Sequence, residues 1–256
     1  MSKIIAIANQ KGGVGKTTTA INLSAALSRF GRKALLIDLD PQGNAGRGLG
    51  VNVHAETNNI YAVLAGRLKI SQAIISTPFD GLDLIPSNLS LAQFEAENRG
   101  GVDPFSVLKN ALKGIPENRY DYLILDCPPS LGLLTLNALN ASDSVLIPVQ
   151  CEYFAMEAVA AILSTVAKVQ REWNPKLVIE GFLLTMYDPR TTLGTEIQSQ
   201  VRKAFKENTF LTVIPRNQSV AESQGRQMPV TSFRPNSQGS SAYFSLAREV
   251  MDHEGR

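Results

Sequence analysis

The sequence predicts one α/β domain over residues 1–256, with a mainly parallel, twisted sheet and helices on both faces. The first observation behind this prediction is that short apolar runs alternate with helical patterns, which is typical of parallel sheets. The second is a length of 256 residues with 44% hydrophobic content, enough for one large core. No internal repeat or interdomain linker interrupts the pattern, so we expect a single domain.

The predicted strands are short, nearly continuous apolar runs, as expected for strands that are buried on both faces. They are Ile4–Ala8, Ala34–Ile37, Leu82–Ile85, Tyr122–Leu125, Val145–Val149, Leu177–Leu184 and Leu211–Ile214. Helices are expected at residues 17–29, 104–113, 131–139, 155–172, 194–206 and 240–251. The second of these begins after Asp103 and Pro104, a residue pair that suits the start of a helix.

Two segments break this regular alternation. Residues 41–50 are so rich in glycine that we expect no fixed shape without a ligand. Residues 215–240 form a long polar stretch that we expect to be a loop. Both follow predicted strands, and ligands of parallel sheets bind beyond the carboxyl ends of the strands. The two segments are therefore candidates for a binding site.

The segment from Asn9 to Thr18 has the composition of a phosphate-binding loop. Its glycines allow the backbone N–H groups to turn inward around an anion. Lys16 supplies a positive charge for the terminal phosphates, and the Thr17 hydroxyl suits Mg²⁺. A predicted strand precedes the loop and a helix follows it, which directs the helix N-terminus at a phosphate. The sequence thus predicts a P-loop NTPase-type domain.

A second lysine, Lys11, stands just before the glycines of this loop. The usual pattern G-x-x-x-x-G-K-[ST] requires a glycine where this chain has Gln10, so the strict pattern is absent. Lys11 can hardly fold back into its own loop beside Lys16. We therefore expect it to reach a nucleotide held by another subunit, which would make dimerisation depend on the bound triphosphate.

Three aspartates follow predicted strands near this loop. Asp126 ends the run that starts at Tyr122 and is a candidate Mg²⁺ ligand, directly or through water. Asp38 and Asp40 are two residues apart on an extended chain and point to the same side. One of them could enter the metal shell, and the other could orient the attacking water. Asp38 could contact the metal through a water molecule. The segment after Asp40 fits a switch that becomes ordered on the triphosphate.

Several motifs together resemble one known family. They are the loop with Lys11 and Lys16, residues 38–44 (DLDPQGN), residues 126–135 (DCPPSLGLLT), residues 148–153 (PVQCEY) and residues 213–217 (VIPRN). With them the chain resembles the ParA family of chromosome and plasmid partition ATPases, which are P-loop ATPases with a deviant Walker A motif. It is most similar to the short, Soj-like chromosomal type. The resemblance extends over nearly the whole chain.

The resemblance implies specific roles for the residues of these motifs. Lys11 would contact the partner subunit's nucleotide, and Gly12 would lie at the interface between subunits. Gly13, Val14, Gly15, Lys16, Thr17 and Thr18 would form the phosphate site, with Thr17 on Mg²⁺. Asp40 would position the hydrolytic water, so that Lys11, Lys16 and Asp40 form the catalytic set. Asp126 would be the Walker B carboxylate, and Pro215 and Asn217 would lie near the adenine.

The resemblance also implies a cycle of partners. Binding of ATP and Mg²⁺ would form a homodimer that binds double-stranded DNA non-specifically, in the cytoplasm and on the nucleoid. A ParB-like activator would trigger slow hydrolysis and move DNA or another cargo. Arg190 and Arg216 would contact DNA, and residues 188–248 hold eight basic against four acidic residues. We expect no N-terminal helix-turn-helix extension for operator binding.

Two departures from the family pattern leave alternatives open. Residues 218–220 (QSV) are closer to the cell-division ATPase MinD, so a MinD-like regulator on a membrane or protein scaffold is the alternative function. Residues 247–256 are acidic and poor in large apolar side chains, which argues against membrane anchoring. Arg47 replaces a small residue, and the sequence offers no explanation for it.

A redox ATPase resembling the nitrogenase iron protein is a third possibility. It would need two exposed cysteines in each chain for a bridging cluster. Cys127 and Cys151 are the only cysteines, and we expect both to be buried thiols.

Overall fold

The computed structural model describes residues 2–98, 103–152 and 155–254. Its strands are β1 (Lys3–Ile7), β2 (Ala34–Asp38), β3 (Ile75–Ser76), β4 (Leu82–Ile85), β5 (Tyr122–Asp126), β6 (Ser144–Gln150), β7 (Val178–Tyr187) and β8 (Thr209–Pro215). Its α-helices are α1 (Lys16–Arg29), α2 (Asn44–Gly48), α3 (Ile60–Leu64), α4 (Ala92–Glu97), α5 (Val107–Leu112), α6 (Leu133–Ala141), α7 (Ala155–Glu172), α8 (Thr192–Phe205), α9 (Gln218–Gly225), α10 (Val230–Phe233) and α11 (Gln238–Asp252). Short 3₁₀ turns lie at Ile70–Gln72, Leu89–Leu91 and Lys206–Asn208.

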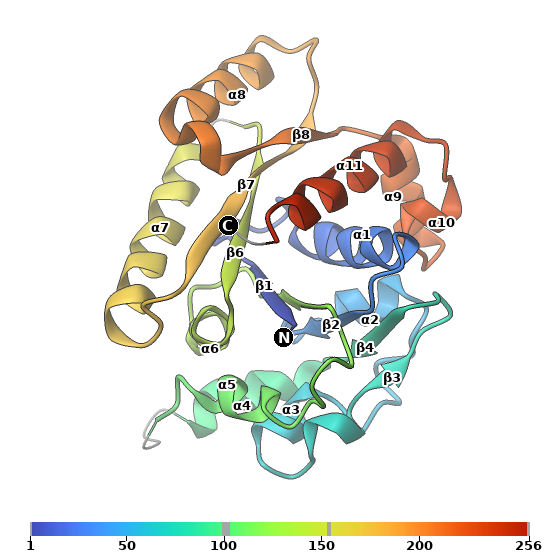
Figure 1. Cartoon of the computed structure of the whole chain (residues 1–256), viewed down its shortest axis with the longest axis vertical. Coiled ribbons are helices and arrows are strands. Elements are labelled where there is room, and N and C mark those ends of the chain that lie inside the picture. Colours follow the sequence, from blue (N-terminus) through green and yellow to red (C-terminus); the bar gives the residue numbers. More distant parts are fainter. Residues whose placement is uncertain (1, 99–102, 153–154, 255–256) are drawn as a thin grey trace.

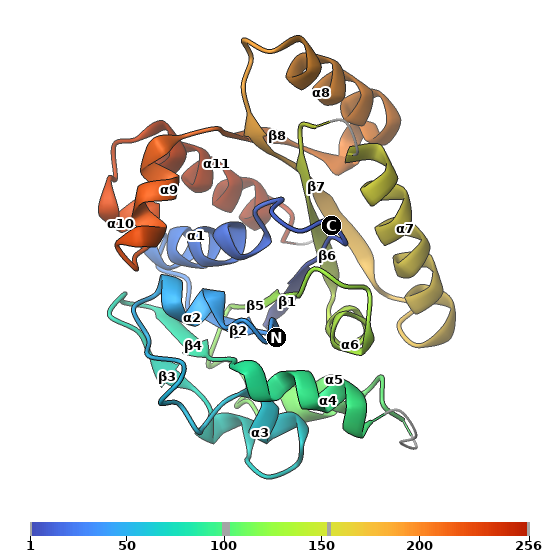
Figure 2. The ribbon, with the colours of Figure 1, turned by 180° about the vertical axis from the view of Figure 1, so that it is seen from behind.

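The strands form an eight-stranded sheet in the order β3-β4-β2-β5-β1-β6-β7-β8 (Figure 1). The pairs from β4 to β8 are parallel, and the two-residue edge strand β3 runs antiparallel to β4. Helices cover both faces of the sheet, as Figures 1 and 2 show. The predicted fold class is confirmed.

Two apolar cores lie on the two faces of the sheet. On one face, α1 and α11 pack against β1, β2 and β5 through residues such as Leu23, Leu27 and Leu246. On the other face, α3 to α8 form the larger core with the remaining side chains of the same strands. Strand residues alternate between the two cores, because successive side chains point to opposite faces. Leu36 faces the core with α1, for example, whereas Leu35 faces the other.

The register of the central strands determines where the predicted site residues lie. Asp126, the last residue of β5, pairs with Ile7 of β1 on one side and with Asp38 of β2 on the other. The loop of residues 8–15 leaves β1 at the same edge of the sheet. The parallel arrangement therefore brings both carboxylates next to this loop.

Two predictions about loops were wrong. Residues 44–48 form helix α2, in which Ala45 and Gly46 donate backbone hydrogen bonds to the buried Asp38 carboxylate. The segment is therefore held in place by a side chain that its own composition does not reveal. Residues 218–225 and 230–233 are helices α9 and α10, and Asn217 caps the first of them. The helix expected from residue 104 begins only at Val107.

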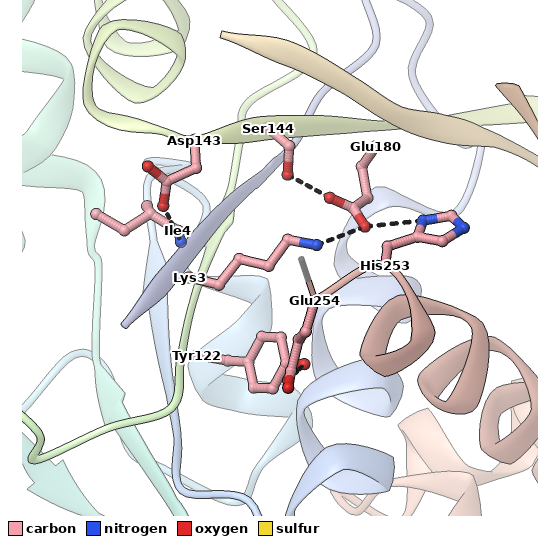
Figure 3. A network of polar contacts seen from close by, with 8 residues as sticks. All are labelled: Lys3, Ile4, Tyr122, Asp143, Ser144, Glu180, His253 and Glu254. Carbon is pink, nitrogen blue, oxygen red and sulfur yellow. Dashed lines mark hydrogen bonds and ion pairs between the residues drawn. The ribbon is translucent and has the colours of Figure 1, made fainter. Parts of the chain in front are cut away.

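A polar network closes the amino edge of the sheet (Figure 3). The buried Glu180 carboxylate accepts hydrogen bonds from Lys3 Nζ at 2.8 Å and from Ser144 Oγ at 2.5 Å. The ring of His253, just after α11, lies 3.2 Å from the same carboxylate. Glu254 accepts a hydrogen bond from the Tyr122 hydroxyl. The network ties the end of α11 to β1 and β7, at the edge opposite the loop of residues 8–15.

None of the helices in the described ranges combines the length and the apolar character that a membrane span requires. Tyr153 lies outside the described residues, although it belongs to one of the motifs behind the family resemblance. Residues 255–256 also lie outside them.

Replacing Leu36 by alanine should destabilise the fold strongly, because the side chain is fully buried in the core beneath α1. We expect a loss of about 2–5 kcal/mol in the free energy of unfolding, measured by urea denaturation. Leu211→Ala is the matched control, since Leu211 is 81% exposed on β8 and should change stability by less than about 0.5 kcal/mol. Equal losses for both variants would contradict the burial described here.

Candidate active site

A cleft of about 970 Å³ opens at the carboxyl edge of the sheet. Its floor is the glycine loop with the first turns of α1, including Gly13, Lys16 and Thr17. One wall comes from the segment between β2 and the end of α2, and the other from the end of β8 and from α9. The structure thus brings the loop, Asp40 and the residues 215–217 around one space.

The glycine loop has a conformation that its sequence requires. Gly13 and Gly15 have φ angles of 76° and 88°, in the left-handed region that favours glycine. Asn9 anchors the loop, because its Oδ1 accepts from the Lys11 N–H at 3.0 Å and its Nδ2 donates to the Pro148 carbonyl at 2.7 Å. Thr185 Oγ1 donates to the Val14 carbonyl at 2.9 Å. The loop is therefore braced by β6 and β7 before any anion is bound.

The two lysines of the loop lie in different surroundings. Lys16 lines the cleft, and its Nζ donates to the Lys11 carbonyl at 3.1 Å. Burial lowers the pKa of Lys16, so an anion in the cleft would stabilise its charged form. Lys11 is not among the residues that line the cleft, and its Nζ forms an ion pair with Glu152 at 3.1 Å. Only Lys16 is thus directed at the space above its own loop.

Asp126 carries a buried carboxylate whose two oxygens have no hydrogen-bond donor in the described part of the chain. Burial raises its pKa well above the usual range, and the charge of Asp38 adds to this effect. The Thr17 hydroxyl and the Lys16 ammonium are the groups that favour its ionised form. Buried carboxylates need a cation or hydrogen-bond donors. Asp126 and Thr17 therefore fit a hydrated Mg²⁺ by their chemistry.

Asp38 and Asp40 differ in what their carboxylates contact. The buried Asp38 accepts from the backbone N–H groups of Asp40 and Ala45, each at 3.0 Å, and of Gly46 at 3.4 Å. Burial nevertheless raises its pKa. Asp40 is half-buried and lines the cleft, and among the described residues its Oδ1 accepts only from the Gln42 N–H, at 2.9 Å. Asp40 is thus the one of the pair that can act on a molecule in the cleft.

Pro215 and Asn217, expected near the adenine, both line the cleft. Asn217 also caps α9, because its Oδ1 accepts from the Ser219 N–H at 3.0 Å. On the neighbouring strand β7, Met186 lines the cleft with a φ of 51°, a conformation that is rare for a side chain of this size. Backbone strain of this kind is concentrated at functional sites.

Arg190 and Arg216, expected to contact DNA, lie near each other. The pairing of Tyr187 with Pro215 at the ends of β7 and β8 brings them together. Arg190 is 86% exposed and donates through Nε and Nη2 to both oxygens of Asp188, at 2.9 and 2.7 Å. These bonds lower the pKa of Asp188 to about 2. Arg216 is exposed at the rim of the cleft.

Three site residues were missed by sequence reasoning. Asn9 anchors the loop, Glu152 pairs with Lys11, and Gln224 of α9 donates from Nε2 to the Thr18 hydroxyl at 2.5 Å. Asn9 could have been found, since it directly precedes the loop. Glu152 and Gln224 are 141 and 206 residues from their partners, and no local pattern marks such contacts.

The two cysteines are both buried, as expected. Burial raises the pKa of the Cys127 thiol and raises that of Cys151 to about 11. Buried thiols with raised pKa values do not suit the ligands of an iron–sulfur cluster at a subunit surface.

Residues 2–179 match the AAA_31 family, which is described as an AAA domain. The chain is 48% identical to the sporulation initiation inhibitor protein Soj of Bacillus subtilis over 250 residues, which cover 98% of each chain. It is 44% identical to the chromosome partitioning protein ParA of Caulobacter vibrioides, over 98% of this chain and 95% of ParA. The chain belongs to the Soj and ParA family. It is accordingly a P-loop ATPase, and ATP and Mg²⁺ are its cofactors.

Solved structures with the same fold extend this comparison. A Mycobacterium smegmatis protein described as cobyrinic acid a,c-diamide synthase, with a bound ATP analogue and magnesium, is 36% identical. Its TM-score is 0.90, and the match covers 100% of this chain and 96% of the Mycobacterium smegmatis chain. The septum site-determining protein MinD of Pyrococcus horikoshii, complexed with Mg-ADP, is 28% identical with a TM-score of 0.82, over 100% and 98% of the chains. This chain thus shares its fold with nucleotide-bound proteins of different names.

The contacts of Asp38 predict that its carboxylate stabilises helix α2 and takes no direct part in the reaction. In Asp38→Ala, the buried N–H groups of Ala45 and Gly46 lose their acceptor, and we expect a loss of about 2–4 kcal/mol in the free energy of unfolding. Asp40→Ala is the matched control and should lose less than about 1 kcal/mol. Denaturant unfolding without nucleotide measures both, and an equally stable Asp38 variant would refute this role.

Proposed function

We propose that this Soj and ParA family member is a Mg-ATP-dependent dimerisation switch that binds DNA non-specifically. A ParB-like activator would accelerate its slow ATP hydrolysis and thereby drive the movement of a chromosome, plasmid or other cargo. The protein would work in the cytoplasm, on the nucleoid.

The observation that carries this proposal is the separation of the two loop lysines. Lys16 faces the cleft of its own chain, whereas Lys11 is held by an ion pair with Glu152 outside that cleft. This pair is partly exposed, with 28% and 49% of the two side chains accessible, so breaking it costs only about 0–1 kcal/mol. A nucleotide on a second subunit offers Lys11 a stronger anionic partner. Triphosphate binding and dimerisation would then depend on each other.

The remaining residues of the site divide the chemistry in this proposal. The N–H groups of residues 13–18 and the Lys16 ammonium would bind the phosphates at the N-terminus of α1. Thr17 and Asp126 would hold Mg²⁺, which supplies charge neutralisation at the terminal phosphates. Asp40 would orient the water for in-line attack. Pro215 and Asn217 would border the adenine.

The DNA-binding part of the proposal is supported by the two arginines at the ends of β7 and β8. Arg190 and Arg216 are both exposed, and phosphate contacts by such side chains need no base-specific geometry. Arg190 is held by Asp188 in the structure, so a DNA phosphate would compete with that carboxylate. Dimerisation doubles the number of such contacts, which explains why ATP would strengthen binding.

The first test uses Asp40→Ala, which should bind ATP and remain a dimer because hydrolysis is blocked. We expect it to bind double-stranded DNA with Mg-ATP but not with Mg-ADP, and to lose this binding steeply as salt increases. Fluorescence anisotropy over a salt series measures the effect. The double variant Asp40→Ala with Lys11→Ala is the control and should stay monomeric and unbound.

If the Asp40→Ala variant forms a dimer but does not bind DNA, the DNA-binding part of the proposal is contradicted. The proposed ATP-dependent dimerisation is not. Sedimentation of this dimer with anionic vesicles would then favour the MinD-like alternative.

The second test addresses the arginines. Arg190→Ala and Arg216→Ala should each weaken DNA binding to the same degree for unrelated sequences and reduce the salt slope by about 1. Arg171→Ala is the control, because Arg171 is also exposed but lies at the end of α7 that leads into the start of β7, whereas Arg190 and Arg216 lie beyond the ends of β7 and β8. An unchanged salt slope in both test variants would exclude these residues from the DNA surface.

A further inference from the structure

Arg47 is a charged residue of the cleft that neither the family motifs nor the proposed cycle accounts for. It lies on α2 and lines the cleft together with Thr18, Gln224 and Gln227. Its side chain is exposed. Its Nη2 lies 3.2 Å from His54 Nε2, and since arginine only donates, that imidazole nitrogen acts as the acceptor. In the described part of the chain no carboxylate forms an ion pair with it.

The packing of α2 determines which end of the cleft Arg47 faces. A Cβ at Gly48 would lie 2.5 Å from the Ile21 side chain, so α2 rests directly on the second turn of α1. Ile21 and Thr18 share one face of α1, because residues three apart are neighbours on a helix. Across the cleft, Gln224 donates to the Thr18 hydroxyl. Gly48, the neighbour of Arg47 on α2, thus packs on the face of α1 that carries Thr18, and Arg47 lines the same cleft as Thr18.

The charges around the cleft are unbalanced. In the described part of the chain, its lining contains the cations Lys16, Arg47 and Arg216 and one acidic residue, Asp40. An exposed guanidinium without a carboxylate partner is suited to bidentate contact with phosphate oxygens. Because α2 is fixed by its contacts with Asp38 and with α1, the arginine is presented from a rigid element.

We propose that Arg47 is a further nucleotide-binding residue of this chain, which contacts the phosphate next to the ribose from the α2 wall. This inference deepens the nucleotide site of the proposed function and depends on it. The contact is made to a phosphate that ADP and ATP share. Arg47 therefore increases the affinity for both nucleotides equally and does not distinguish between them.

The test compares Arg47→Ser, Arg47→Lys and the unmodified chain by titration with fluorescent ADP and with a non-hydrolysable ATP analogue, in the presence of Mg²⁺. We expect Arg47→Ser to weaken both nucleotides by about tenfold, and Arg47→Lys to lose less because it keeps the charge. Arg29→Ser is the control, since Arg29 is exposed at the far end of α1 and should leave both affinities unchanged. Thermal unfolding without nucleotide should be the same for all variants.

Each other outcome overturns the assignment. Equal affinities for Arg47→Ser and the unmodified chain would show that Arg47 does not touch the nucleotide. A loss for the ATP analogue alone would move the contact to the terminal phosphate. An unmodified chain that binds neither nucleotide would refute the proposed function as well, so the two failures are distinguishable.

Discussion

The burial of the Asp126 carboxylate is the constraint on which the rest of the site depends. Parallel pairing of β5 with β1 and β2 forces this side chain into the interior, beside Asp38 and below the glycine loop. Burial raises the pKa of both carboxylates, the charge of Asp38 raises that of Asp126 further, and burial lowers the pKa of Lys16. A magnesium ion carrying a polyphosphate would offset the buried charges of Asp126 and Lys16. The arrangement of these charges is thus complementary to a Mg²⁺–polyphosphate ligand.

Asp38, the last residue of β2, and Asp40, two residues beyond it, show how one short motif serves two purposes. Asp38 uses its oxygens on the backbone of α2, and Asp40 keeps its own directed at the cleft. Their different surroundings arise because the chain turns sharply at Gly43, where a Cβ would lie 2.7 Å from the Ser87 carbonyl. A glycine at this position is therefore a requirement of the active site.

The sequence predicted the fold and the floor of the site well, because both depend on local patterns. The central strands and α1 follow from apolar runs, and Lys16 and Thr17 follow from the loop motif. Helices α2 and α9 were missed, since glycine and polar residues dominate them and their stability comes from Asp38 and from the Asn217 cap. The partner of Lys11 could not be predicted either. Glu152 follows β6, and it comes close to Lys11 only because β6 lies next to β1 in the folded sheet.

The helical form of residues 44–48 has a thermodynamic consequence. Ordering a flexible segment costs conformational entropy, about 1–2 kcal/mol for each residue whose backbone becomes fixed. In this protein that entropy is lost during folding, when the Asp38 carboxylate accepts hydrogen bonds from the N–H groups of Ala45 and Gly46. A nucleotide then meets a wall that is already formed. The free energy of its contacts with that wall therefore remains available for affinity instead of being consumed by ordering the chain.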